Sequence, residues 1–207
     1  MRDSFGRGGK LFVVSGPSGA GKGTICKRVK EDLHMDLSIS MTTREPRPGE
    51  VHGKDYFFVS EEEFLRNIEE GNLLEHAQVY DHRYGTPRDA VMKRLDMKHN
   101  VLLEIDIQGG LQVKRSMPES VLIFILPPSL KVLRERLTGR GTDAPDVVEK
   151  RLAKALNEIK LIGEYDYYVV NDELDRAVSL TESIIRAEES RVPSKIMPLI
   201  RKYEEEE

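Results

Sequence analysis

The chain has 207 residues, of which 33% are charged and 39% hydrophobic, and its formal net charge at pH 7 is -4. This length suits one domain with a substantial core, and the slightly acidic balance supplies no general basic field for nucleic acid or an anionic membrane. The single cysteine, Cys26, excludes an intrachain disulfide, and the longest aliphatic run, 121–126, ends at Pro127. The N-terminal residues lack the apolar core of a signal peptide, so we expect a soluble cytoplasmic protein.

The first predicted strand, 11–14, is followed by a glycine-rich loop and a helix over 22–33. Backbone N–H groups of such a loop turn toward phosphate oxygens, and a lysine at the helix start adds positive charge. A strand before the loop and helical spacing after it favour a nucleotide phosphate site over a simple connecting turn. The loop consists of Gly16, Pro17, Ser18, Gly19, Ala20, Gly21, Lys22, Gly23 and Thr24.

One position departs from the strict phosphate-loop pattern, in which Lys is followed by Ser or Thr. Here Gly23 follows Lys22, so the hydroxyl that binds Mg²⁺ in the strict pattern is missing. Thr24 cannot replace it, because a helix turns about 100° per residue. We therefore expect Mg²⁺ to be held through water, phosphate oxygens and a carboxylate elsewhere in the chain.

Residues from about 38 to 100 are too many for a simple connection and predict an inserted subdomain. A capping box at Ser60 and Glu63 predicts a helix over 64–70, and Thr86 and Pro87 predict another over 91–95. Between 40 and 56 the sequence concentrates groups that contact phosphate. Arg44 and Arg47 can bind an anion in bidentate fashion, and the alternative is a polar surface loop whose arginines are merely solvated.

Further apolar strands are predicted at 101–105, 121–126 and 167–170, with helices at 110–116, 129–137 and 173–189. This alternation is typical of a parallel sheet covered by helices. Residues 138–146, with glycines around Arg140, predict a mobile lid that leads into a helix over about 147–162. The final residues, 204–207, are all glutamates and indicate a solvated end.

Two acids follow the strand at 101–105. Glu104 interrupts an aliphatic run, where an acid is costly without a partner or ligand. Asp106 comes two residues later on the same strand face and is the candidate to orient Mg²⁺ directly or through water. The alternative for Asp106 is a cap on the next helix. The five histidines show no metal-ligand spacing.

At this point the chain resembles guanylate kinases, which transfer phosphate from ATP to GMP. The resemblance covers about 10–188 and rests on five segments in family order: the phosphate loop, 44–56, 104–109, 139–142 and 170–172. It implies a single domain with a P-loop parallel sheet flanked by helices, an inserted mixed α/β subdomain and a mobile lid. The implied regions are a core (8–37, 98–137 and 164–190), a GMP-binding insert (38–97), a lid with its following helix (138–163) and a C-terminal tail (191–207).

The resemblance also implies that ATP and GMP are the substrates, that Mg²⁺ is the cofactor, and that the protein acts in guanine nucleotide metabolism and salvage. It further implies roles for individual residues. It assigns catalysis to Lys22, Arg44, Arg136, Arg140 and Arg151, and places the ATP base near Asn171. It assigns GMP binding to Ser40, Arg44, Arg47, Tyr56, Glu75, Tyr84, Thr86, Glu104 and Asp106. A carboxylate suits guanine because the base presents two N–H donors side by side, whereas adenine would leave the acid unpaired.

Two other functions compete with this one. A GTPase is suggested by Asp106-Ile107-Gln108-Gly109, which matches the Asp-x-x-Gly switch, although Asn171 is followed by Asp172 and not by Lys. A non-catalytic scaffold that binds protein partners has no physical need for Lys22, Arg44 and Arg140. The sequence leaves open the oligomeric state, the preference between GMP and dGMP, and any regulation.

Overall fold

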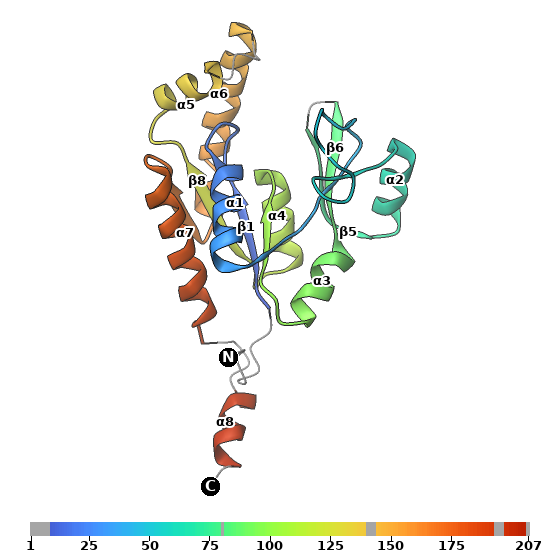
Figure 1. The fold of residues 1–207 in the computed structure, drawn as a ribbon, viewed down its shortest axis with the longest axis vertical. Coiled ribbons are helices and arrows are strands. Elements are labelled where there is room, and N and C mark those ends of the chain that lie inside the picture. Colours follow the sequence, from blue (N-terminus) through green and yellow to red (C-terminus); the bar gives the residue numbers. More distant parts are fainter. Residues whose placement is uncertain (1–8, 80, 140–143, 193–196, 206–207) are drawn as a thin grey trace.

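The computed structural model describes residues 9–79, 81–139, 144–192 and 197–205. It contains a five-stranded sheet in the order β2-β7-β1-β8-β9, in which all neighbouring strands run parallel. Helices pack on this sheet, and a second, mixed sheet lies beside it (Figure 1). The expected α/β fold class is therefore confirmed. The strands of the first sheet are β2 (Asp36–Leu37), β7 (Val101–Glu104), β1 (Leu11–Ser15), β8 (Val121–Leu126) and β9 (Tyr167–Val170).

The parallel sheet is apolar on both faces, as expected for strands covered by helices on each side. Successive residues of β1 enter opposite cores: Phe12 and Val14 belong to one buried cluster, and Leu11 and Val13 to the other. The first cluster is completed by α1 (Lys22–Leu33) and α7 (Leu174–Glu189), the second by α3 (Arg88–Asp96) and α4 (Ile107–Ser116).

A third, smaller core joins α5 (Leu130–Thr138) to α6 (Pro145–Ile159), which flank residues 140–143. Within the described ranges, its buried residues come from these two helices. In Figure 1 the pair lies at the same end of the molecule as the start of α1. A short 3-10 helix, η1 (Ile162–Glu164), then leads into β9.

The insert forms the second sheet, in the order β4-β3-β6-β5. Its strands are β3 (Met41–Thr42), β4 (Phe57–Phe58), β5 (Leu73–Val79) and β6 (His82–Pro87), and its first helix is α2 (Glu61–Glu69). The expected cap is present, since the Ser60 hydroxyl accepts a hydrogen bond from the Glu63 N–H. The helix begins at Glu61, three residues before the predicted range, because the cap residue immediately precedes it.

Other elements also differ from expectation, among them α3, which begins at Arg88 and not at residue 91. Helix α4 begins at Ile107 and not at residue 110, because β7 ends at Glu104 and Asp106 caps the helix. Helix α6 begins at Pro145, where proline is well tolerated in a first turn. The C-terminal tail contains α8 (Met197–Glu204), so Glu204 ends a helix that the acidic composition did not predict. No helix in the described ranges is long and apolar enough to cross a membrane.

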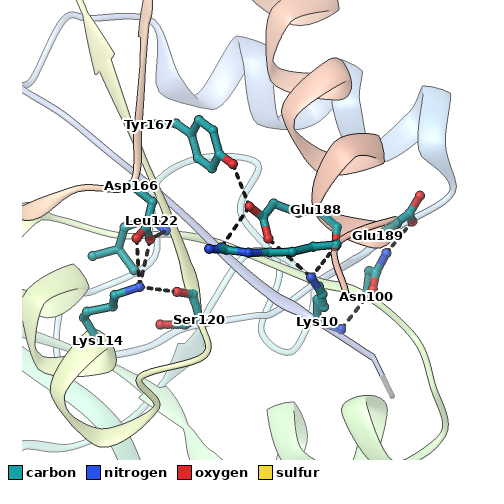
Figure 2. A network of polar contacts seen from close by, with 10 residues as sticks. Lys10, Asn100, Lys114, Ser120, Leu122, Asp166, Tyr167, Glu188 and Glu189 are labelled. Atoms are coloured by element: carbon teal, nitrogen blue, oxygen red, sulfur yellow. Dashed lines mark hydrogen bonds and ion pairs between the residues drawn. The ribbon is translucent and has the colours of Figure 1, made fainter. Parts of the chain in front are cut away.

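A polar network ties β1, β9 and the last turns of α7 together (Figure 2). The side chain of Glu188 is only 4% exposed and forms an ion pair with Lys10, at 3.3 Å. The Tyr167 hydroxyl donates to Glu188 at 2.6 Å, and Arg191 lies 3.3 Å from the same carboxylate. Burial alone would raise the pKa of Glu188, but the Tyr167 hydrogen bond and the neighbouring positive charges outweigh it and lower the pKa.

We expect Glu188→Gln to lower the free energy of unfolding by about 1–3 kcal/mol, because Lys10 loses its buried counter-charge. Urea unfolding at neutral pH measures this change. The matched control is Glu189→Gln, the exposed neighbour that accepts from Asn100, and we expect a change within about 0.5 kcal/mol there. Equal effects of the two substitutions would show that the buried pair adds no stability.

Candidate nucleotide site

The carboxyl ends of the parallel strands bring distant residues to one edge of the sheet. The glycine-rich loop follows β1, Glu104 ends β7, and Asn171 directly follows β9. Ligands of open α/β sheets bind outside this edge. The three groups are separated by many tens of residues in sequence, so their proximity depends on the strand order.

Asn171 supports the loop from β9. It is 6% exposed, and its amide Nδ2–H donates to the carbonyl of Ala20 at 2.8 Å. Gly21, the cap of α1, has a φ of 95°, and a Cβ atom there would lie 2.2 Å from Nδ2 of Asn171. The loop shape therefore needs glycine at 21 for two reasons, the positive φ and the close approach of Asn171.

The side chain of Lys22 folds back over the first residues of the glycine-rich loop. Its Nζ donates to the carbonyls of Gly16, at 2.7 Å, and Pro17, at 3.2 Å. Burial lowers the pKa of Lys22, while the negative charges of Glu104 and Glu158 oppose that change. A less hydrated ammonium interacts more strongly with an anion than one in bulk water, so this position suits binding of phosphate.

Glu104 is the acid next to the first turn of α1. A Cβ atom on Gly23 would lie 3.3 Å from Oε1 of Glu104, so the carboxylate occupies space beside the position where the strict pattern has a hydroxyl. Loss of hydration raises the pKa of Glu104, and the Lys22 charge opposes the rise. The side chain is nevertheless accessible to solvent.

Asp106 has a structural role that the sequence left as the alternative. Its Oδ1 accepts from the Gly109 N–H at 2.8 Å and caps α4. Because β7 ends before it, Asp106 does not share a strand face with Glu104. In the described part of the chain, no group of three or more His, Cys, Asp or Glu residues could hold a metal ion.

A cationic and aromatic cluster forms in the insert. The guanidinium of Arg44 donates from Nη2 to both carboxylate oxygens of Glu50, each at 2.9 Å. It also lies 5.5 Å from the ring centre of Tyr56 and 5.7 Å from that of Phe58. The rings of Tyr56 and Tyr84 are 6.0 Å apart, so two phenol groups border the arginine.

The two remaining phosphate candidates of the insert, Ser40 and Arg47, lie on either side of Arg44 in sequence. The Ser40 carbonyl accepts from the Phe57 N–H at 2.9 Å, which places Ser40 beside the segment that carries Tyr56. Arg47 is exposed, and its main-chain N–H donates to Glu50 at 2.8 Å. Glu50 therefore orders both arginine positions.

Glu75 and Thr86 form a buried pair between β5 and β6. The Thr86 hydroxyl donates to Oε1 of Glu75 at 2.6 Å, and Glu75 is 4% exposed. Burial raises the pKa of Glu75 to about 7; the Thr86 hydrogen bond opposes this rise and the Asp106 charge adds to it. A carboxylate held in this way can accept two adjacent N–H donors, which is the pattern of guanine.

The insert cluster and the sheet edge act on each other electrostatically. Burial raises the pKa of Tyr56, and the nearby Tyr84 and the charge of Glu104 contribute to the same rise. Since Glu104 also acts on Lys22, the same acid is close to both the glycine-rich loop and the insert. The structure thus brings the two candidate phosphate sites to one region.

The arginines predicted around the lid are placed only in part. Arg136 on α5 donates from Nη2 to the Asn171 carbonyl at 2.8 Å, and its Nη1 is buried without a hydrogen-bond partner in the described residues. Such a group is expected to gain a partner when a ligand binds. Arg151 lies half-buried on α6. Arg140 lies outside the described residues.

Three residues were missed by the sequence analysis. Glu50 pairs with Arg44, and the three-residue spacing of Arg44, Arg47 and Glu50 was the only signal for it. Glu158 on α6 acts electrostatically on Lys22, and its pKa is raised by burial. Gln112 on α4 bonds to the main chain of β5, and no local pattern indicates such a contact.

Comparison with known proteins gives consistent matches. The family model described as Guanylate kinase matches residues 8–188. A guanylate kinase of Caldanaerobacter subterraneus subsp. tengcongensis is 54% identical over 91% of this chain and 92% of its own, and one of Clostridioides difficile is 49% identical over 98% and 99%. The crystal structure of guanylate kinase from Anaplasma phagocytophilum aligns with a TM-score of 0.75 at 36% identity, covering 89% of this chain and 88% of that one.

Proposed function

We propose, because this chain belongs to the guanylate kinase family and phosphorylates GMP to GDP with ATP, that the transfer takes place at the carboxyl edge of the parallel sheet. The observation that supports this placement is that Glu104, at the end of β7, lies beside Gly23 of the loop and acts electrostatically on Tyr56 of the insert. The glycine-rich loop with Lys22 lies on one side, and the Arg44 cluster of the insert lies on the other.

On the donor side, the ATP phosphates bind the main-chain N–H groups of residues 16–24 and the Lys22 ammonium. Asn171 contributes by holding the loop at Ala20 and by fixing Arg136 through its own carbonyl. We also propose that the base of ATP lies near Asn171. Arg136 then uses its buried, unpartnered Nη1 to bind an oxygen of the transferred group.

On the acceptor side, the GMP phosphate binds Arg44, Arg47 and the hydroxyls of Ser40, Tyr56 and Tyr84. Arg44 is already ordered by Glu50 and by two aromatic rings, which reduces the entropy lost on binding. The guanine N1–H and N2–H donate to Glu75, with Thr86 holding the carboxylate and Glu104 and Asp106 in the surrounding polar shell. dGMP lacks only the 2′-hydroxyl, and we propose it as an additional acceptor.

The reaction needs little acid or base chemistry, because the GMP phosphate is already an anionic nucleophile. Its oxygen attacks the γ-phosphorus of ATP in line, and the bond to the β,γ-bridging oxygen breaks to leave ADP. Catalysis therefore depends on positioning and charge neutralisation by Lys22, Arg44, Arg136, Arg140 and Arg151. We propose that α5 and α6 close over the substrates and exclude water.

Mg²⁺ is the proposed cofactor, and the residues at the edge fit it. Glu104, beside Gly23, and Asp106 would hold it largely through water, and the ion would offset repulsion between the two substrates. Glu104 is the better placed of the two, since Oδ1 of Asp106 already caps α4.

The competing GTPase function fits less well. Residues 107–109, which resemble a GTPase switch, form the first turn of α4 under the Asp106 cap and do not form a loop.

The substrates are small molecules, and we propose neither nucleic acid nor membrane as a partner. Cys26 is buried, which fits a reducing compartment, and we propose a cytoplasmic location.

The first test is ADP formation from Mg-ATP with GMP, AMP, CMP or UMP offered separately. We expect turnover with GMP alone among these four, and a loss of about 100-fold or more in Lys22→Ala. A no-acceptor control measures hydrolysis. ADP release at equal rates with and without GMP would contradict the kinase assignment and favour an NTPase.

Below pH 7 we expect kcat/KM for GMP to fall about tenfold per pH unit, because protonated Glu75 no longer accepts two donors. The GMP phosphate also takes up a proton near pH 6. Glu75→Gln is therefore the control: it should have a much higher KM for GMP and should retain only the pH dependence of the phosphate.

The titration of Glu75 should affect stability in the opposite direction to its effect on GMP binding. Its pKa is about 7 in the folded protein and ordinarily 4.5, so its contribution is fully present below pH 4.5 and lost as the pH rises through 7. Glu75→Gln should thus stabilise the protein by about 1–3 kcal/mol at pH 8, with the difference vanishing toward pH 4.5. If kcat/KM for GMP has the same pH dependence in the wild type and in Glu75→Gln, Glu75 is excluded as the titrating group.

The two acids at the edge are distinguished by their Mg²⁺ dependence. At fixed ATP, Glu104→Gln should raise the Mg²⁺ concentration for half-maximal rate by about tenfold. Asp106→Asn should leave that concentration within about twofold and lower stability by at most about 1–2 kcal/mol, as a weakened helix cap. The reverse pattern would assign the metal to Asp106.

A further inference from the structure

Helix α4 and strand β5 connect the core to the insert, and their contact includes the buried acid Glu75. The helix packs directly against the strand and lies between the parallel sheet and the insert (Figure 1). Gln112 fastens the two elements by a reciprocal pair of hydrogen bonds. Its Oε1 accepts from the His76 N–H at 3.2 Å, and its Nε2–H donates to the His76 carbonyl at 2.8 Å.

One turn before Gln112, the backbone of Gly109 faces the carboxylate of Glu75. A Cβ atom on Gly109 would lie 2.4 Å from Oε2 and 3.1 Å from Cδ of Glu75. The distance to Oε2 is far below van der Waals contact, so a side chain at 109 would displace the carboxylate or the strand. The strand has little freedom to move, because Gln112 holds the residue next to Glu75.

The two oxygens of Glu75 are therefore positioned from different parts of the molecule. Oε1 accepts from Thr86 of the insert at 2.6 Å, and Oε2 lies against Gly109 of the core. We infer that Gly109 is a specificity-determining position, whose missing side chain gives Glu75 the place from which it binds the guanine N–H groups. The inference rests on the proposed role of Glu75 in binding GMP.

The local sequence supports a functional reason for this glycine. Gly109 and Gly110 are consecutive and buried at the end of the first turn of α4, although glycine is among the least favourable residues in helices. Asp106 caps the same turn by accepting from the Gly109 N–H, so the backbone position is fixed as well. A helix that needed only to pack would be more stable with alanine at 109 if the space allowed it.

The test compares Gly109→Ala, Glu75→Asp and the double variant by steady-state kinetics with GMP and ATP varied separately. We expect Gly109→Ala to raise KM for GMP about tenfold or more and to leave KM for ATP within about twofold. The shorter acid in Glu75→Asp leaves room for the added methyl group. In that background Gly109→Ala should therefore raise KM for GMP by less than about twofold further.

Two further measurements separate a positioning role from general damage. The preference for GMP over IMP, which lacks the N2 amino group, should shrink in Gly109→Ala, because the displaced carboxylate no longer meets both donors. Gly110→Ala is the matched control, since its added methyl group faces the hydroxyls of Tyr165 and Ser15 and not Glu75. It should leave KM for GMP and the GMP preference within about twofold.

The outcomes are distinguishable. An unchanged KM for GMP in Gly109→Ala, or the same fold-increase in both backgrounds, would overturn the inference while leaving Glu75 as the GMP ligand. No effect of Glu75→Asp on GMP would overturn the assignment of Glu75 and the inference with it. If Gly109→Ala does not fold, folding of the double variant supports the contact with Glu75, and failure of both variants overturns it.

Discussion

The site depends on one constraint, the parallel alignment of β1, β7, β8 and β9. Parallel strands end at the same edge, so the glycine-rich loop, Glu104 and Asn171 meet although they lie far apart in the chain. Asn171 then supports the loop across a separation of 151 residues. A change of strand order would leave every one of these side chains in place on its own strand and still dismantle the site.

In the site, charged groups are held with reduced hydration. Burial raises the pKa of Glu75 in the insert and lowers that of Lys22 at the edge, so each group is less stable in its charged form than it would be in water. Substrates supply the missing partners: N–H donors for the acid and phosphate oxygens for the lysine. The free protein therefore sacrifices some stability at these positions, and binding recovers it.

Much of the fold was predictable from local sequence. Apolar runs located β1, β7, β8 and β9, and glycine spacing located the loop, because both signals depend only on neighbouring residues. The short strands of the insert, with two residues each in β3 and β4, carry too little pattern to be recognised. Helix α8 was missed because its acidic end suggested a solvated segment.

The site was less predictable wherever a residue has two suitable roles or acts over a distance. Aspartate is equally suited to a metal shell and to a helix cap, and only the end of β7 at Glu104 shows that Asp106 caps α4. The contact of Gly109 with Glu75 depends on how a helix and a strand pack, which no local pattern encodes.

The link between Lys10 and Glu188 has a consequence for how the chain acquires its structure during synthesis. Lys10 immediately precedes β1, the middle strand of the parallel sheet, and its counter-charge follows 178 residues later. While the chain is being translated, the partner of this lysine does not yet exist, and neither does the helix that covers the adjoining core. The core between α1, α7 and the parallel sheet can therefore be completed only late in synthesis. Until α7 has been made, the apolar central strand of the nascent chain must be kept from aggregating.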